Sequence, residues 1–477
     1  MGQEIEQTRF SAADSAAFAE RLRAETALLQ DYFRDAAFST RDRVGGFELE
    51  AWLIDAAGRP APINAAFLER LDDPLVVPEL ARFNVELNTP PQPLHGDALS
   101  RMHASLAATE ARCQQTAAEF GASLLSIGIL PTLQGADLNP GSMSDLKRYR
   151  ALNEQVLRQR QGQPLVLEIH GREHLKTVHQ DVMLEAATTS FQIHLKVAPE
   201  TAAEAYNLAQ ILSAPLVAIG ANSPYLFGHD LWDETRIPVF EQAVAVGGFA
   251  AASHGPLRRV GFGTGYVRES LFECFQENLE HFPVLLPMCS AAPPERFEHL
   301  RLHNGTLWRW NRPLIGFDDD GTPHLRIEHR VLPAGPTLED AIANAALFFG
   351  LMQFLGSAGV ASSLRLPFPV ARDNFYAAAR DGLEARIQWL NGRHGEVRPL
   401  ILDELLPMAQ RGLEQLELDR ADIARFLGVI RGRAEHACTG AAWQRAYVAR
   451  HGPDWAGLTL AYRERQASGL PVHEWSL

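Results

Sequence analysis

Four segments of this sequence alternate between apolar and polar residues, and this pattern constrains the fold more than any other feature. They span residues 47–53, 83–88, 190–197 and 324–331. Successive side chains of a β-strand point to opposite faces of a sheet, so each segment predicts a strand with one apolar and one polar face. If the strands share one sheet, its apolar face packs on helices and its other face is polar.

The polar faces of these segments carry an unusual set of side chains. The set is Glu48, Glu50, Asn84, Glu86, Asn88, Ser190, Gln192, His194, Lys196, Arg326, Glu328 and Arg330. A sheet face that simply meets water is usually rich in Thr, Lys and Ser, and for any single strand that interpretation stays open. Four carboxylates, an imidazole and two guanidinium groups on four strands favour a common site.

The carboxylates of this set point to a cation. Neighbouring carboxylates raise one another's pKa values unless cations lie between them. Oxygen ligands with a single imidazole suit Mg²⁺ or Mn²⁺ and not a closed zinc site, and Mg²⁺ most often accompanies a phosphorylated substrate such as ATP. Arg326 and Arg330 could neutralise a transferring phosphoryl group or hold a carboxylate. The residues therefore predict a metal-dependent enzyme acting on phosphate and carboxylate groups.

The remainder of the chain is predicted to be mostly helical. Apolar periodicity predicts helices near residues 95–120, 144–160, 199–212 and 337–356, and further strands at 122–130 and 165–170. We expect an N-terminal helical segment at 1–42, a catalytic domain at 43–365 and a wholly helical C-terminal part at 366–477. Because no low-complexity linker separates these parts, the C-terminal part should pack on the same body.

Charge and cysteine content restrict the partners. The 477 residues include 58 Asp and Glu against 44 Lys and Arg, a net charge of −14, which argues against nucleic-acid and membrane partners. The sequence lacks the P-loop pattern and any run of about 18 apolar residues. Its four cysteines are widely spaced, which favours reduced thiols. We expect a cytoplasmic enzyme with small-molecule partners, and homo-oligomerisation is compatible with these features.

Short motifs in the same strands carry a family resemblance. The run Glu48-Leu-Glu50-Ala-Trp-Leu-Ile-Asp55, the run Phe83-Asn-Val-Glu86-Leu-Asn-Thr-Pro90 and the run Arg326-Ile-Glu328-His-Arg330 occur in order. With weaker matches at 120–131 and 220–224, they resemble the plant and bacterial type of glutamate–cysteine ligase, within the glutamine synthetase-like carboxylate–amine ligases. The matches extend over residues 46–350.

The resemblance implies an α+β fold and a ligase activity. The fold would be a curved, mainly antiparallel sheet with helices on its convex face, and the concave face would hold Mg²⁺ ions and the phosphates of ATP. ATP would phosphorylate a glutamate-like carboxylate to an acyl phosphate. An amine such as L-cysteine would then attack to give a γ-glutamyl amide. Plant-type ligases have a small S-G-A-P turn where this chain has Asn-Thr-Pro-Pro at residues 88–91. Because of this difference, the resemblance does not identify the substrates.

The resemblance also implies residue roles. Glu50 and Glu86, with Glu79 as a further candidate, would bind one metal ion, and Glu48, His194 and Glu328 would bind another. Arg330 would stabilise the transferring phosphoryl group with help from Arg326. The nucleotide or substrates would contact Gln192, Asn222 and Arg236.

Several alternatives stay open at this point. Arg236 could instead form a surface ion pair, and Arg148 and Arg150 could either reach an anion or form a surface charge cluster. The same fold group also includes phosphotransferases acting on guanidino or carboxylate groups. A non-catalytic regulatory protein that binds a nucleotide or an amino acid is the third alternative.

Overall fold

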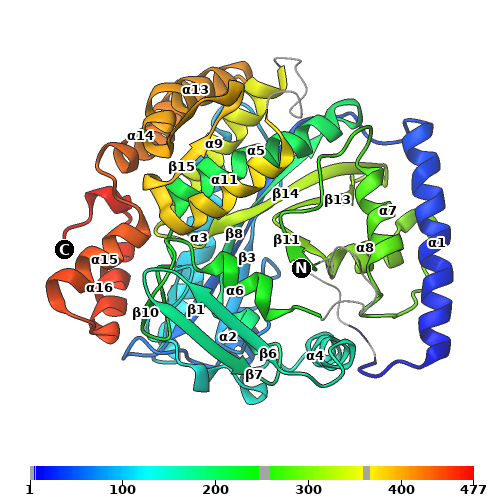
Figure 1. Cartoon of the computed structure of the whole chain (residues 1–477), viewed down its shortest axis with the longest axis horizontal. Helices are drawn as coiled ribbons and strands as arrows, with labels where there is room; N and C mark the ends of the chain where they lie inside the picture. Colours follow the sequence, from blue (N-terminus) through cyan, green and yellow to red (C-terminus); the bar gives the residue numbers. More distant parts are fainter. Residues whose placement is uncertain (1–4, 6, 247–257, 358–365) are drawn as a thin grey trace.

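The four alternating segments lie side by side in one antiparallel sheet of a computed structural model (Figure 1), which describes residues 5, 7–246, 258–357 and 366–477. The strand order is β13-β14-β8-β1-β3-β2, and β4 and β5 also pair with β1. The strands are β1 (Val44–Ile54), β2 (Val76–Pro78), β3 (Asn84–Asn88), β4 (Gln92–Pro93), β5 (Ser123–Leu125), β8 (Ser190–Val197), β13 (Asn311–Phe317) and β14 (Pro323–Pro333). The predicted antiparallel sheet is confirmed.

The register of the sheet places the polar residues opposite one another. Glu50 pairs with Glu86 across β1 and β3, and His194 pairs with Glu328 across β8 and β14. Residues directly opposite in an antiparallel pair share a face, so the polar side chains form one continuous surface. The second segment begins one residue later than expected, because Phe83 precedes β3 and stacks on Trp52, with ring centroids 5.4 Å apart.

The opposite face of the sheet is apolar and is covered by α3, α5 and α9. The helices are α1 (Ala12–Arg34), α2 (Asn64–Leu71), α3 (Ala98–Glu119), α4 (Lys147–Gln159), α5 (Ala202–Gly220), α6 (Arg236–Ala243), α7 (Phe272–His281), α8 (Glu298–Gly305), α9 (Leu338–Ser357), α11 (Phe368–Asp381), α12 (Val397–Leu400), α13 (Leu406–Gln415), α14 (Arg420–Glu435), α15 (Gly440–His451) and α16 (Trp455–Ala467). Phe47 and Leu49 of β1 lie in this core, and His329 of β14 stacks on Phe348 of α9. Full burial of each such apolar side chain contributes about 1.5–3 kcal/mol.

Helix α9 is a core helix of this layer. By length and composition it could cross a membrane, but 83% of its most apolar 18-residue window is buried inside the molecule. It crosses α13 at Gly350 and Gly412, where the two backbones touch so closely that a Cβ atom on Gly412 would overlap the carbonyl group of Gly350. Helices α13 and α14 both pack on α9, so this part of the chain lies directly against the helical layer of the sheet.

The predicted helices are largely confirmed, with two differences. The helix expected at 199–212 runs on to Gly220, with Pro215 inside it. The C-terminal part is not wholly helical, because β15 (Arg386–Gln388) and β16 (His394–Glu396) form a hairpin there. The other two-stranded pairs are β6 (Leu165–His170) with β7 (His174–His179), β9 (Tyr225–Leu226) with β10 (His229–Asp230), and β11 (Val260–Gly261) with β12 (Trp308–Arg309). The division at 42/43 and 365/366 stays a prediction, and residue 365 lies outside the described residues.

Helix α1 packs along α7 and α8 and is fastened by a buried contact (Figure 1). Its Glu25 accepts hydrogen bonds from the ring Nδ1 of His299 and from the backbone N–H of Leu300, at 2.8 Å for the latter. His299 Nε2 in turn accepts from the N–H of Ser290 at 3.0 Å, so the ring proton lies on Nδ1, facing Glu25. Glu25 and His299 are both buried.

Candidate active site

The polar face brings the predicted metal ligands together in two groups. Glu48, His194 and Glu328 form one, here called the His194 group, and Glu50, Glu79 and Glu86 form the other, the Glu50 group. Within each group the potential ligand atoms lie within 4.8 Å of one another. Glu48 and Glu50 are two residues apart on β1, so one strand supplies a ligand to both groups.

The His194 group holds its imidazole between two carboxylates. His194 Nε2 lies 3.2 Å from Glu48 Oε1 and 4.0 Å from Glu328 Oε1. Burial opposes ionisation of Glu48, but the adjacent His194 and Arg326 outweigh it, and the pKa of Glu48 lies below its usual range. Neither ring nitrogen of this buried histidine has a hydrogen-bond partner of good geometry. A buried ring nitrogen that lacks a well-oriented hydrogen bond and lies beside carboxylate oxygens is suited to bind a metal ion.

The Glu50 group concentrates carboxylates away from water. Glu50 accepts hydrogen bonds from the N–H of Ser190 at 2.6 Å and from Nε2 of Gln192 at 3.1 Å. Burial and the facing Glu86 nevertheless raise the pKa of Glu50 to about 7. Burial also raises the pKa of Glu79 well above its ordinary value, with Glu86 and Glu50 adding to the shift. Buried carboxylates that repel one another in this way fit a divalent cation with oxygen ligands.

Three arginines border the His194 group. Arg326 and Arg330 project from β14, and both were expected. Arg312 on β13 was not, although it donates Nε and Nη2 to the two carboxylate oxygens of Glu328, each at 2.8 Å. The signal that could have revealed β13 is the turn Asp318-Asp-Asp-Gly321 ahead of β14, which predicts a hairpin and hence a partner strand.

A cavity of about 300 Å³ adjoins the His194 group. Its polar lining includes Glu48, Glu328, Arg312 and Arg326, and its apolar lining is Leu152, Phe275, Leu286, Met288, Leu302, Trp308, Leu314 and Ile315. Arg148 also lines the cavity, and its guanidinium carbon lies 4.7 Å from the ring centre of Tyr149. Arg150, by contrast, forms an ion pair with the exposed Asp145. The combination of an apolar wall and a cationic rim is typical of a small-molecule pocket.

One further carboxylate near the Glu50 group escaped sequence reasoning. Glu185 lies in a short 3₁₀ helix just before β8, and burial together with the charge of Glu50 raises its pKa to about 8. The residues around Glu185 do not alternate as in a strand, so the sequence pattern gave no reason to select it.

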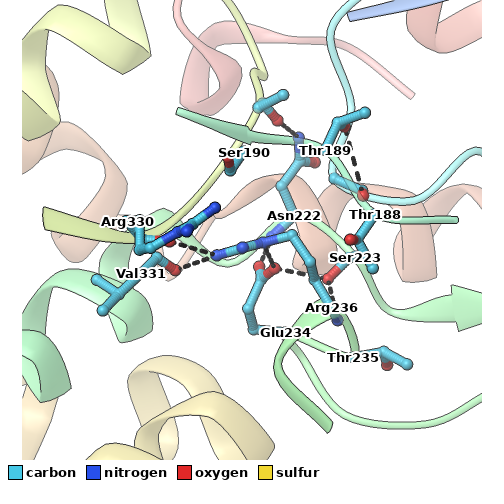
Figure 2. A network of polar contacts seen from close by, with 12 residues as sticks. Thr188, Thr189, Ser190, Asn222, Ser223, Glu234, Thr235, Arg236, Arg330 and Val331 are labelled. Carbon is cyan, nitrogen blue, oxygen red and sulfur yellow. Dashed lines mark hydrogen bonds and ion pairs between the residues drawn. The ribbon is translucent and has the colours of Figure 1, made fainter. Parts of the chain in front are cut away.

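Two predicted binding residues lie in buried hydrogen-bond networks. The amide of Asn222 is buried, donates to the carbonyl of Ala334 and to Tyr462 at 2.8 Å each, and accepts from Gln444 at 2.9 Å. For Arg236 the sequence left two interpretations open, a substrate contact or an ion pair at the surface. In the structure Arg236 forms an ion pair with Glu234, and this pair is buried (Figure 2). Both side chains are engaged inside the protein because their neighbours supply complementary hydrogen-bonding groups.

The sequence matches one family model, that of glutamate–cysteine ligase family 2, over residues 44–464. The chain belongs to this family. As a member, it is an ATP-dependent ligase that forms γ-glutamyl amide bonds. The match covers the strands that carry both groups of ligands, and it agrees with the resemblance found in the sequence.

Two solved structures share the fold of this chain. A glutamate–cysteine ligase from Francisella tularensis in complex with AMP aligns over 92% of this chain and 90% of its own, with a TM-score of 0.51 and 12% identity. A bifunctional glutathione synthetase from Pasteurella multocida aligns over 92% of this chain and 55% of its own, with a TM-score of 0.52 and 13% identity. No curated protein matches in sequence. At these identities the likeness establishes the fold.

Proposed function

We propose that the polar face binds MgATP and glutamate and joins the γ-carboxylate of glutamate to an amine, with L-cysteine as the first amine to test. The observation that carries this proposal is the convergence of the His194 and Glu50 groups on the sheet face that also holds Arg326 and Arg330. Two cation sites beside paired guanidinium groups suit in-line phosphoryl transfer between two anions.

The reaction would proceed in two steps. A γ-carboxylate oxygen of glutamate attacks the terminal phosphorus of ATP, the bond to ADP breaks, and an acyl phosphate forms. The amine then attacks the acyl carbon, phosphate leaves, and the nitrogen loses a proton to give the amide. Bound Mg²⁺ would neutralise the phosphate oxygens and hold them in line.

The chain's own residues would orient these steps. Arg330 would donate to the transferring phosphoryl group, and Arg326 would hold phosphate oxygens at the mouth of the cavity. The apolar wall of that cavity suits the nucleotide base, because Phe275, Met288 and Trp308 offer flat or adaptable contacts. Gln192 would hold Glu50 in place through its hydrogen bond.

The test is ADP release with ATP, Mg²⁺, glutamate and a panel of amines, followed by mass spectrometry of the product. An amide formed with loss of water supports the ligase, whereas a stable phosphorylated product supports a phosphotransferase. Glu48→Gln should weaken MgATP binding and lower turnover by about 10²–10³-fold. Glu69→Gln, which changes an exposed carboxylate on α2, is the control. Metal-independent nucleotide binding without turnover would favour a regulatory protein.

The cellular setting follows from the same proposal. Substrates such as ATP and amino acids are small molecules of the cell interior, which supports a cytoplasmic enzyme. The net charge of −14 supports partners other than nucleic acids.

A further inference from the structure

Arg330 lies in an irregular part of β14. The register between β14 and β8 shifts between His329 and Leu332, so Arg330 and Val331 lie outside the regular ladder. A bulge of this kind redirects side chains and is common beside active sites. The conformation of the bulge therefore determines where the Arg330 guanidinium points.

Helix α6 supplies the donor that this bulge needs. Arg236, the first residue of α6, directs Nη2 at two consecutive backbone carbonyls, that of Arg330 at 3.3 Å and that of Val331 (Figure 2). On the other side of the bulge, the N–H of Arg330 donates to the carbonyl of Trp310 at 3.1 Å. The backbone of Arg330 is thus held from two directions.

Helix α6 also contacts the Arg330 side chain. Phe240, one turn after Arg236, places its ring 5.4 Å from the guanidinium carbon of Arg330. The Arg330 guanidinium is buried, its Nε and Nη1 have no hydrogen-bond partner, and Nη1 lies 3.8 Å from Glu328 Oε2. A ring face stabilises and orients such a cation without using its N–H groups, which stay available for a ligand.

Arg236 is itself fixed by a buried carboxylate. Its Nε lies 3.1 Å from Oε1 of Glu234, and the two side chains are 2% and 0% exposed. Glu234 also accepts from the N–H of Asn222 at 2.9 Å and from Oγ of Ser223 at 2.8 Å. The charge of Arg330 disfavours a second cation at Arg236, and the charge of Glu234 offsets this repulsion.

We propose that Arg236 and Phe240 are positioning residues that aim Arg330 at the transferring phosphoryl group, with Glu234 holding Arg236. This inference rests on the proposed function, in which Arg330 contacts that group. In this proposal Arg236 affects the reaction by holding the backbone of β14 and does not contact the substrate.

The test is rapid chemical quench of full-length enzyme with MgATP and glutamate, which measures the first ADP burst, alongside equilibrium binding of MgATP. Arg236→Lys keeps the charge but loses the planar fork, and it should slow the burst about 10- to 100-fold with the MgATP dissociation constant unchanged within about twofold. Phe240→Leu, which keeps an apolar side chain, should slow the burst in the same way and serves if Arg236→Lys does not fold.

A double-mutant cycle separates positioning from general destabilisation. If Arg236 acts through Arg330, Arg236→Lys should have little further effect on the burst in an Arg330→Lys background, whereas independent effects would multiply. Arg433→Lys is the control, because Arg433 is another fully buried arginine, paired with Asp340 at 3.5 Å behind the sheet. It should lower stability while leaving the burst rate unchanged.

The outcomes distinguish the two proposals. A wild-type enzyme without an ADP burst contradicts the proposed function. The positioning role is overturned if Arg330→Lys slows the wild-type burst while Arg236→Lys and Phe240→Leu leave it unchanged. It is also overturned if their effects multiply independently with that of Arg330→Lys. Burst rates lowered by both α6 variants, unaltered binding and a non-additive cycle support it.

Discussion

Arg312 and Glu328 face each other across β13 and β14 and form a bidentate ion pair, with Nε–Oε2 and Nη2–Oε1 distances of 2.8 Å. Both side chains are buried, at 4% and 1% exposed. The fork fixes the plane of the Glu328 carboxylate, which also lies beside His194. Arg312 therefore acts as the support of a predicted metal ligand.

Removing this support should destabilise the protein. Arg312→Leu leaves a buried carboxylate without its main partner, so we expect the free energy of unfolding in urea to fall by about 3 kcal/mol without metal. Arg41→Leu, which removes the ion pairs of the exposed Arg41 side chain with Asp318 and Asp320, should lower the unfolding free energy much less than Arg312→Leu. Equal losses in the two variants would contradict the importance of the buried fork.

Metal binding should release protons near neutral pH. The pKa of Glu50 is about 7 without metal, so this carboxyl is largely protonated below pH 7 and must lose its proton to bind a cation. Through Glu50 alone, the affinity for Mg²⁺ should therefore rise about tenfold from pH 6 to pH 8. Calorimetry in two buffers of different ionisation enthalpy counts these protons. The Glu50→Gln variant should release fewer, and a pH-independent affinity in the wild type would refute the prediction.

Helix α1 should influence the cavity although it precedes the family match at residue 44. Glu25 fastens α8, which contributes Arg301 and Leu302 to the cavity lining. In Glu25→Gln the NH₂ group of the new side chain would face the N–H of His299 or that of Leu300, and one hydrogen bond would be lost. We therefore expect the unfolding free energy to fall by about 2 kcal/mol and the KM for ATP to rise. Glu20→Gln, at an exposed position of the same helix, is the control. An unchanged KM in Glu25→Gln would show that the cavity wall is held by other contacts.

Stability should decrease as the pH falls below about 6.5, in part because of His303. Burial lowers the pKa of His303 to about 4, and its Nε2 donates to the carbonyl of Asn278 at 2.9 Å. Between pH 6.5 and pH 4 the unfolded chain binds a proton at this residue and the folded chain does not, so the unfolding free energy falls with pH. The contribution is about 3 kcal/mol over this range. Urea unfolding of His303→Gln should show a pH dependence weaker by that amount, and identical slopes would rule the contribution out.

Sequence alternation predicted which polar side chains share a face because it depends only on the geometry of a strand. Glu48, Glu50, Glu86, His194 and Glu328 lie where the two-residue repeat placed them, on one face of one sheet. Arg312 was missed because Pro313, which lies inside β13, weakens the strand signal of that segment.

The binding roles predicted for Asn222 and Arg236 could not be judged from the sequence, because they depend on which distant segments pack around these side chains. The surroundings of Asn222 and Arg236 come from chain segments as distant as Tyr462 and Val331, and these contacts engage both side chains internally. The β15–β16 hairpin was missed for a related reason. Its strands are three residues each, too short to show a period among helical segments.

The two ligand groups take adjacent outward positions of β1, at Glu48 and Glu50. Because a strand advances about 3.3 Å per residue, their Cα atoms are separated by about 6.6 Å, and no side-chain motion changes this interval. The backbone of one strand therefore fixes the separation of the two proposed cation sites. We therefore expect the length of a ligand that bridges both sites to determine whether it binds, in addition to its contacts with the side chains.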